Sequence, residues 1–202
     1  MRRQDLAHIL RAASQIADQP DVLVIGSQSI LGAYDQNQLP DAAVASIEAD
    51  IAFFDDSDDA KSDLVDGAIG EDSRFHSTFG YYAQGVSVAT AVLPAGWRDR
   101  LIVFEGESTR PGRGLCLDPH DLVVSKLVAG REKDFQFAAA LINAGLVDPV
   151  ILTQRAQTLP VVPGVQRRVH EWITAHDTPR RPAAPAPEPP RRTEPPGLGL
   201  TY

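Results

Sequence analysis

Cysteine is scarce in this chain, which has 202 residues and a single thiol, Cys116. One thiol cannot form an internal disulfide or a cysteine-ligated zinc site, and this indicates a reducing compartment such as the cytoplasm. No run of eighteen apolar residues occurs, so the sequence predicts no membrane span. The N-terminal residues lack the continuous apolar core of a signal peptide. Their apolar side chains recur at helical spacing instead, which predicts an amphipathic helix.

Positive charge is also in deficit, because 19 lysines and arginines face 27 acidic residues and give a net charge of −8. This balance argues against broad affinity for nucleic acid, although a local basic patch is compatible with it. The apolar content of 43% and the length suit one globular domain with a sizeable core. From residue 177 the chain is rich in proline. We therefore expect a domain over 1–176 and a disordered tail over 177–202.

Hydrophobic patterning predicts an α+β fold, α/β-like, with a mixed sheet of four to six strands and a helical C-terminal half. The run VLVIG, 22–26, reads as a buried strand, and SIEADIAFF, 46–54, alternates as a strand does. We expect these two strands to be neighbours in one sheet. The other expected elements are a short helix over 27–34, a hairpin within 77–94, a strand over 98–107, helix over 118–146 with a break near Gly130, and two further helices before the tail.

Two carboxylates share one face of the strand 46–54. Glu48 and Asp50 are two residues apart, so their side chains point the same way. Like charges at that distance repel each other, and burial makes the repulsion worse. A hard divalent cation, Mg²⁺ or Mn²⁺, would relieve the repulsion. The alternative is a solvated face of the sheet.

A glycine-serine turn, Gly26-Ser27, ends the first buried strand and begins the short helix. Such a turn lets backbone amides approach a phosphate, and the N-terminus of a helix favours negative charge. Together with Glu48 and Asp50 it would form a site for a nucleoside triphosphate and a metal ion. Ser46 lies two residues before Glu48 and would orient phosphate or a metal-bound water; alternatively it is an ordinary strand serine.

The segments VIGSQSI and SIEADIAF together resemble the signature of the nucleotidyltransferase fold, in which an apolar strand ends in Gly-Gly or Gly-Ser and a later strand carries acid-x-acid. The first acid here is glutamate where aspartate is usual. The segment DLVVSKLVAGREKDFQF, 121–137, is similar to a helix block of the abortive-infection nucleotidyltransferase toxins. More broadly, 20–160 looks like a bacterial group of uncharacterised nucleotidyltransferase-like proteins. The resemblance implies a metal held by Glu48 and Asp50, and Asp134 as a catalytic or metal-adjacent acid.

The segment 121–137 supplies cations for a phosphate. Lys126 would neutralise a triphosphate as a point charge, and Arg131 would clamp phosphate with two hydrogen bonds. We expect Lys126 to face Glu48 and Asp50 across a cleft and to be drawn toward them. Arg131 and Asp134 share a helix face if the helix is continuous; the alternative is a surface ion pair.

For two further residues we favour a structural role over a metal-binding or catalytic one. Glu105 ends the run LIVFE of the expected strand, and we interpret it as a solvent-exposed strand end rather than as a third metal ligand. His76 lies among aromatic residues and reads as a packing histidine rather than as a catalytic one.

The leading functional hypothesis is transfer of a nucleoside monophosphate from a nucleoside triphosphate to an acceptor hydroxyl. Resemblance to the toxin group implies a tRNA 3′ end as acceptor and a toxin–antitoxin system with a cognate antitoxin. One alternative is an antitoxin-type enzyme that adenylylates a partner toxin protein. Another is a degenerate nucleotidyltransferase fold that binds without catalysis.

Overall fold

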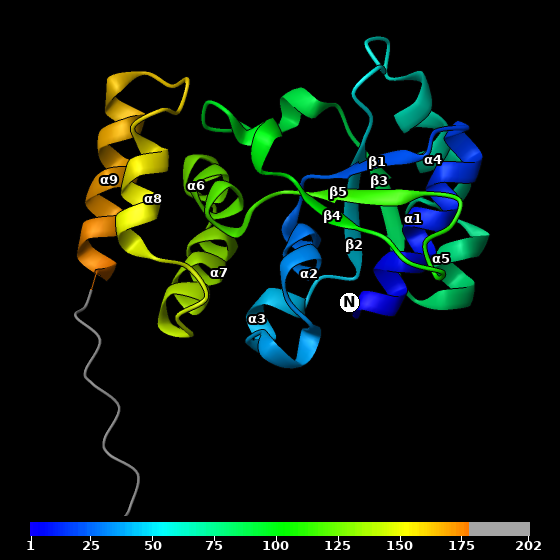
Figure 1. Ribbon diagram of the computed structural model, residues 1–202, viewed down its shortest axis with the longest axis horizontal. Coiled ribbons are helices and arrows are strands. Elements are labelled where there is room, and N and C mark those ends of the chain that lie inside the picture. The colour runs from blue at the N-terminus through cyan, green and yellow to red at the C-terminus, as the bar shows by residue number, and fades with distance from the viewer. Residues whose placement is uncertain (178–202) are drawn as a thin grey trace, which may run out of the picture.

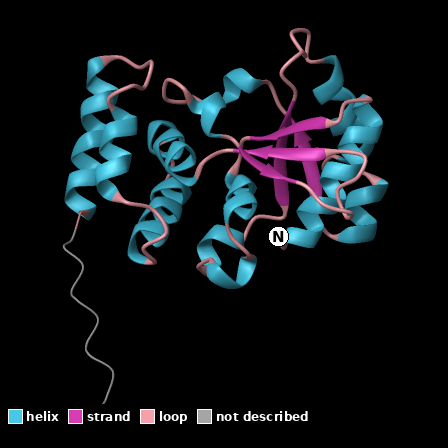
Figure 2. Ribbon diagram, viewed as in Figure 1, coloured by secondary structure: helices cyan, strands magenta, loops and turns pink. Residues whose placement is uncertain are grey.

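A five-stranded mixed sheet lies at the centre of the computed structural model, which describes residues 1–177 (Figures 1 and 2). The strands are β1 (Asp21–Val24), β2 (Glu48–Ala52), β3 (Tyr82–Gly85), β4 (Ile102–Phe104) and β5 (Arg113–Cys116), in the order β3-β2-β1-β5-β4. The expected tail falls outside the described residues from residue 178 onward. The predicted α+β class with a mixed sheet is confirmed.

Helices surround the sheet and fill the C-terminal half of the described chain. They are α1 (Arg3–Ala17), α2 (Ile30–Ala33), α3 (Asp41–Val44), α4 (Ala60–Ile69), α5 (Arg74–Phe79), α6 (Pro119–Ala129), α7 (Glu132–Asn143), α8 (Pro149–Ala156) and α9 (Pro163–His176). Four short 3₁₀ helices join them: η1 (Ser27–Ser29), η2 (Gln36–Gln38), η3 (Val88–Thr90) and η4 (Trp97–Arg100). Figure 1 shows α6 to α9 gathered at one end of the sheet and α1, α4 and α5 at the other. Within residues 1–177 no helix is long and apolar enough to cross a membrane.

The pairing of β1 with β2 places the glycine turn beside the acidic strand. The two strands run antiparallel, with Leu23 opposite Ala52, so the expected adjacency is confirmed. Beyond the last paired residues, the Ile25 N–H donates to the Asp50 carbonyl at 3.1 Å. Because the strands are antiparallel, the end of β1 lies next to the beginning of β2. Gly26 is thereby brought beside Asp50.

The core forms where α1 packs on the sheet. Leu6 and Leu10 of α1 are fully buried, as are Val22 and Val24 of β1. Gly114 of β5 permits this close approach, since a Cβ there would lie 2.8 Å from the Leu10 Cδ1. Each fully buried aliphatic side chain contributes about 1.5–3 kcal/mol relative to an exposed one. The predicted amphipathic N-terminal helix is confirmed, and its apolar face anchors β1 and β5.

The predicted hairpin within 77–94 is wrong. Residues Arg74–Phe79 form α5, because the Ser73 hydroxyl caps the helix by accepting the His76 N–H at 3.1 Å and Gly80 ends it at a φ of 76°. The single strand β3 follows and pairs parallel with β2. A parallel pair needs a long crossover, which α4 and α5 supply.

Two other expectations needed correction. The strand expected over 98–107 is only β4, because Trp97–Arg100 coil into η4. No strand was expected over Arg113–Cys116, which form β5; this strand lies between β1 and β4 and pairs parallel with β1. The expected break near Gly130 is confirmed: Gly130 has a φ of 68° and separates α6 from α7.

Candidate active site

The backbone of Gly26 lies directly under the carboxylate of Asp50. A Cβ added at Gly26 would lie 1.4 Å from the Asp50 Oδ2, a distance that no side chain can occupy. The backbone of Gly26 has an ordinary extended conformation, so the requirement for glycine is one of space rather than of φ. The η1 turn begins immediately afterwards, with the Ser29 N–H donating to the Gly26 carbonyl at 3.0 Å. The glycine turn and the acid therefore meet as the sequence predicted.

The electrostatic environment of Asp50 is unfavourable for its ionised form. Burial raises the pKa of Asp50, and the neighbouring charge of Glu48 raises it further, to about 6. The positive charges of Lys126 and Arg131 act in the opposite direction without cancelling the rise. Near neutral pH the ionised form of Asp50 is therefore energetically unfavourable, and a bound cation would stabilise it.

Glu48 is held by a residue that the sequence analysis did not single out. The Tyr82 hydroxyl donates to the Glu48 Oε2 at 3.1 Å, and Tyr82 is directly opposite Glu48 in the β2–β3 ladder. Burial and the charge of Glu48 raise the pKa of Tyr82 to about 12, so its hydroxyl stays protonated and remains a donor. His76 packs on Tyr82 with ring centroids 4.7 Å apart, which agrees with the packing role expected for it.

Asp50 and the cations Lys126 and Arg131 line one cavity of about 90 Å³, which we call the acid–cation cavity. Its walls come from the end of β1, from β2, from the segment after β3, and from α6 and the start of α7. The lining residues are Ile25, Gly26, Asp50, Val86, Thr90, Ala91, Leu122, Ser125, Lys126, Ala129, Arg131 and Asp134. Lys126 on α6 thus lines the same cavity as Asp50, whereas Glu48, the other acid that it was expected to face, does not line it.

Lys126 forms its ion pair with Asp134 rather than with Glu48 or Asp50. Its Nζ lies 3.3 Å from the Asp134 Oδ1, and the Arg131 Nε donates to the Asp134 Oδ2 at 2.7 Å. Burial alone would raise the pKa of Asp134, but the Arg131 hydrogen bond and the Lys126 charge hold it below its usual value. The expectation that Lys126 is drawn to Glu48 and Asp50 is wrong, because Asp134 is a nearer, ionised and almost fully buried partner with 1% exposure.

The Arg131–Asp134 pair forms across a helix start rather than along a continuous helix. Arg131 is the N-cap of α7, and its backbone N–H also donates to the Asp134 Oδ2 at 3.3 Å. Asp134 thereby fixes both cations at the rim of the cavity. Its carboxylate accepts hydrogen bonds from Lys126 and Arg131, so it is paired with the two cations.

Glu48, the other expected metal ligand, lies outside the lining of the acid–cation cavity, as do Ser46, Ser27 and Glu105. The Ser46 hydroxyl donates to the Glu48 carbonyl at 3.2 Å and accepts the Glu48 N–H at 3.1 Å, so it shapes the start of β2. Ser27 is half-buried next to Gly26. Glu105 is exposed after β4, at the end of the sheet away from Gly26, and lines a separate pocket with Arg113. The solvent-exposed reading of Glu105 is confirmed.

The acid pair suits a cation that completes its shell with substrate. Within residues 1–177 no group of three or more histidine, cysteine, aspartate or glutamate side chains is arranged to hold a metal ion. Mg²⁺ is commonly bound by one or two carboxylates, with phosphate oxygens and water as the remaining ligands. Two carboxylates on one face of β2, of which Asp50 has a raised pKa, beside a glycine that leaves room for phosphate, fit this mode of binding.

Comparison with protein families places this arrangement in a known group. The family model described as a nucleotidyltransferase of unknown function (DUF6036) matches residues 4–172, which include all five strands and the acid–cation cavity. Comparisons with curated proteins and with solved structures found no match. Because the matched segment covers most of the chain, the protein belongs to this family of nucleotidyltransferases of unknown function.

Proposed function

We propose that the protein is a metal-dependent enzyme that transfers a nucleoside monophosphate from a nucleoside triphosphate to an acceptor hydroxyl. The observation that carries the proposal is the acid–cation cavity, which Asp50 over Gly26 lines together with Lys126 and Arg131. Phosphoryl transfer requires negative charge to be neutralised from more than one side of the phosphate chain, and this cavity offers two charged walls.

Each residue has a role in the proposed reaction. The acceptor hydroxyl releases its proton to solvent as its oxygen bonds to the α-phosphorus, the bond between that phosphorus and the bridging oxygen breaks, and pyrophosphate leaves. Lys126 and Arg131 bind non-bridging oxygens, while Gly26 and Ser27 border the phosphates at the end of β1. Glu48 and Asp50 would hold Mg²⁺ or Mn²⁺, which would stabilise the charge that develops on the phosphate. Tyr82 and the Ser46 hydroxyl fix the orientation of Glu48.

For the acceptor we propose a tRNA 3′ end, and for the biological setting a toxin–antitoxin system with a cognate antitoxin. This rests on the likeness of 121–137 to the toxin group. Arg131 and Lys133 are exposed at the start of α7, beside the cavity, where they can meet RNA phosphates. Arg113 is paired with Asp21 at 2.6 Å at the other end of the sheet, so it contributes little at this site.

Two observations support second candidates. The net charge of −8 favours a protein acceptor, such as a partner toxin that is adenylylated. The absence of a cluster of three acids within residues 1–177 favours a fold that binds nucleotide without catalysis. Label transfer from α-labelled nucleoside triphosphates, with Mg²⁺ and either total tRNA or co-encoded proteins, separates these outcomes. Labelled tRNA supports our proposal, labelled protein supports the first alternative, and nucleotide binding without pyrophosphate release supports the second.

Lys126→Gln is expected to weaken nucleoside triphosphate binding by about tenfold or more, because a hydrogen bond to a charged group contributes about 1.5–3 kcal/mol. Lys126 is only 12% exposed and neutralises buried Asp134, so a modest loss of stability should accompany the loss of affinity. The measurement is a nucleotide titration at a temperature well below both unfolding midpoints. Lys133→Gln, an exposed lysine on the next helix, is the matched control. Equal affinities for Lys126→Gln and the wild type would remove Lys126 from the site.

A further inference from the structure

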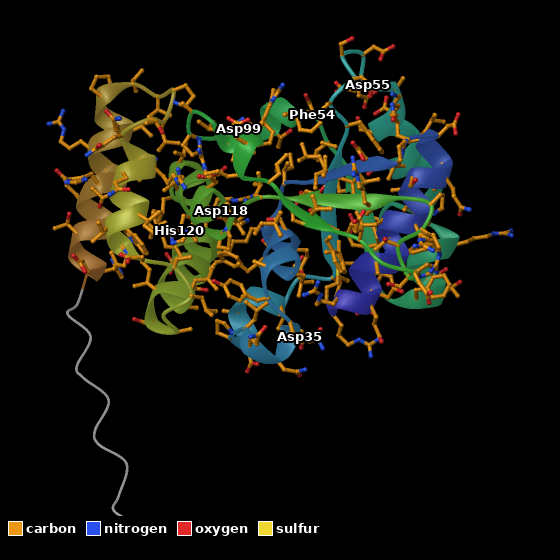
Figure 3. All side chains as sticks on the ribbon, in the orientation of Figure 1. Asp35, Phe54, Asp55, Asp99, Asp118 and His120 are labelled. Carbon is orange, nitrogen blue, oxygen red and sulfur yellow. The ribbon has the colours of Figure 1, made fainter. Side chains whose placement is uncertain are left out.

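A second and larger pocket adjoins the acid–cation cavity. It has a volume of about 560 Å³, and we call it the aromatic pocket. It is formed by the end of β2, the segment from β3 to η4, and η4 itself; its lining residues include Phe54, Ser87, Val88, Ala91, Trp97 and Arg98. Phe54 and η4, in which Asp99 is labelled, lie at the same upper edge of Figure 3.

The acid–cation cavity and the aromatic pocket share a wall. Ala91 lines both of them, and the short segment around η3 contributes Thr90 to the cavity and Val88 to the pocket. Phe54 follows Asp50 by four residues, so their Cα atoms are at most about 14 Å apart. A molecule that places its phosphates beside Asp50 can therefore extend into the aromatic pocket.

The volumes show why such an extension is needed. Sites for small molecules usually occupy about 300–1,000 Å³, so a cavity of about 90 Å³ accepts only part of a nucleotide. The aromatic pocket has the volume that the remainder of the molecule requires. The charged groups gather in the small cavity, and the large rings gather in the adjoining pocket.

The chemistry of the aromatic pocket suits a planar ring. The Phe54 and Trp97 ring centroids are 5.9 Å apart at an interplanar angle of 31°. The Arg98 guanidinium lies 4.9 Å from the Phe54 centroid and 5.5 Å from that of Trp97. Phe54 remains 43% exposed, although exposure of a large apolar ring is unfavourable. Aromatic faces beside an arginine are the surfaces on which proteins stack nucleobases.

We propose that the aromatic pocket binds a nucleobase by stacking on Phe54, Trp97 and Arg98. This inference rests on the proposed function for the position of the phosphates. The base belongs either to the donor nucleotide, whose triphosphate lies in the acid–cation cavity, or to the terminal nucleotide of an RNA acceptor. Both sources present the same ring to the same residues, and the experiment below distinguishes them.

Intrinsic fluorescence reports on the pocket without requiring catalysis. The chain has two tryptophans, so Trp172→Phe leaves Trp97 as the sole tryptophan. Titration of this variant with AMP, GMP, CMP and UMP in the absence of Mg²⁺ should quench Trp97. Phe54→Leu in the same background should weaken the binding about tenfold, since base stacking on an aromatic side chain contributes 1–3 kcal/mol. Phe79→Leu is the matched control, because Phe79 is 48% exposed and lies on α5 outside the pocket.

Two further titrations identify the source of the base. If Phe54→Leu weakens Mg²⁺–nucleoside triphosphate binding but not tripolyphosphate binding, the pocket takes the donor base. If it weakens only the binding of single-stranded RNA without a 5′ phosphate, the pocket takes the acceptor base. Unchanged affinity of Phe54→Leu for every probe would overturn the inference and leave the proposed function standing. Base binding that depends on Phe54 in a protein without transfer activity would support the inference and contradict the proposed function.

Discussion

Replacement of Asp50 by asparagine is expected to abolish nucleotidyl transfer while stabilising the folded protein above neutral pH. Loss of the carboxylate removes half of the proposed metal site, and a loss of at least a hundredfold in rate is expected. The amide has nearly the same shape but no charge. It therefore removes the repulsion from Glu48 and the cost of burying a charge that together raise the pKa of Asp50 to about 6.

The pH dependence of stability follows from the direction of this shift. In the folded protein Asp50 holds its proton more tightly than in the unfolded chain, so its contribution to stability is fully present below about pH 4 and is lost as pH rises through about 6. Asp50→Asn should therefore match the wild type near pH 4 and exceed it by about 1–2 kcal/mol at pH 8. Chemical unfolding at both pH values measures this difference, and Asp58→Asn on the exposed acidic loop is the control. A variant less stable than the wild type at pH 8 would contradict the account of Asp50.

Gly26→Ala is expected to abolish nucleotide binding and to destabilise the fold. The added Cβ would lie 1.4 Å from the Asp50 Oδ2, so the carboxylate or the β1 backbone must move. Overpacking of this kind usually costs about 1–3 kcal/mol. Nucleotide titration and thermal unfolding of the variant measure both effects. Gly67→Ala is the control, because a Cβ at that helical position meets nothing within 4 Å and should be neutral or slightly stabilising.

A double variant tests whether the loss of stability in Gly26→Ala comes from the clash of the new Cβ with Asp50. Asp50→Ala removes the Oδ2 and the Cγ, the two atoms nearest the new Cβ at Gly26, and leaves only the Cβ of residue 50, at 2.9 Å. Gly26→Ala combined with Asp50→Ala should therefore be more stable than the sum of the single effects predicts, by more than about 0.5 kcal/mol. Transfer should stay absent in the double variant because the acid is missing. Additive stability effects would show that Gly26 and Asp50 are not in contact.

The contact between Gly26 and Asp50 was predictable because both residues lie in strands with clear local patterns. An apolar run marks β1, an alternating run marks β2, and antiparallel pairing of the two brings the turn to the acid. In contrast, no strand was expected over β5, since the segment RGLC has little alternation and its glycine meets a need for space beside Leu10 of α1. That requirement is a packing contact between distant segments, which local patterning does not contain.

The partners of the site residues were less predictable than the residues themselves. Tyr82 holds Glu48 only because β3 pairs parallel with β2, whereas the sequence suggested a hairpin in that region. Lys126 lines the same cavity as Asp50, but its ion pair with Asp134 depends on the near-complete burial of that carboxylate. A clue was present at Gly130, where the break between α6 and α7 makes Arg131 and Asp134 a capping pair.

The central claim is that Asp50 and a divalent cation act together in nucleotidyl transfer. The most direct measurement follows α-labelled nucleoside triphosphates and released pyrophosphate with total tRNA, for the wild type in Mg²⁺, the wild type in chelator and Asp50→Asn in Mg²⁺. We predict labelled acceptor and pyrophosphate in equal amounts for the first sample and neither product for the other two. Equal labelling by Asp50→Asn or in chelator would contradict the claim, as would nucleotide binding by the wild type without any labelled acceptor.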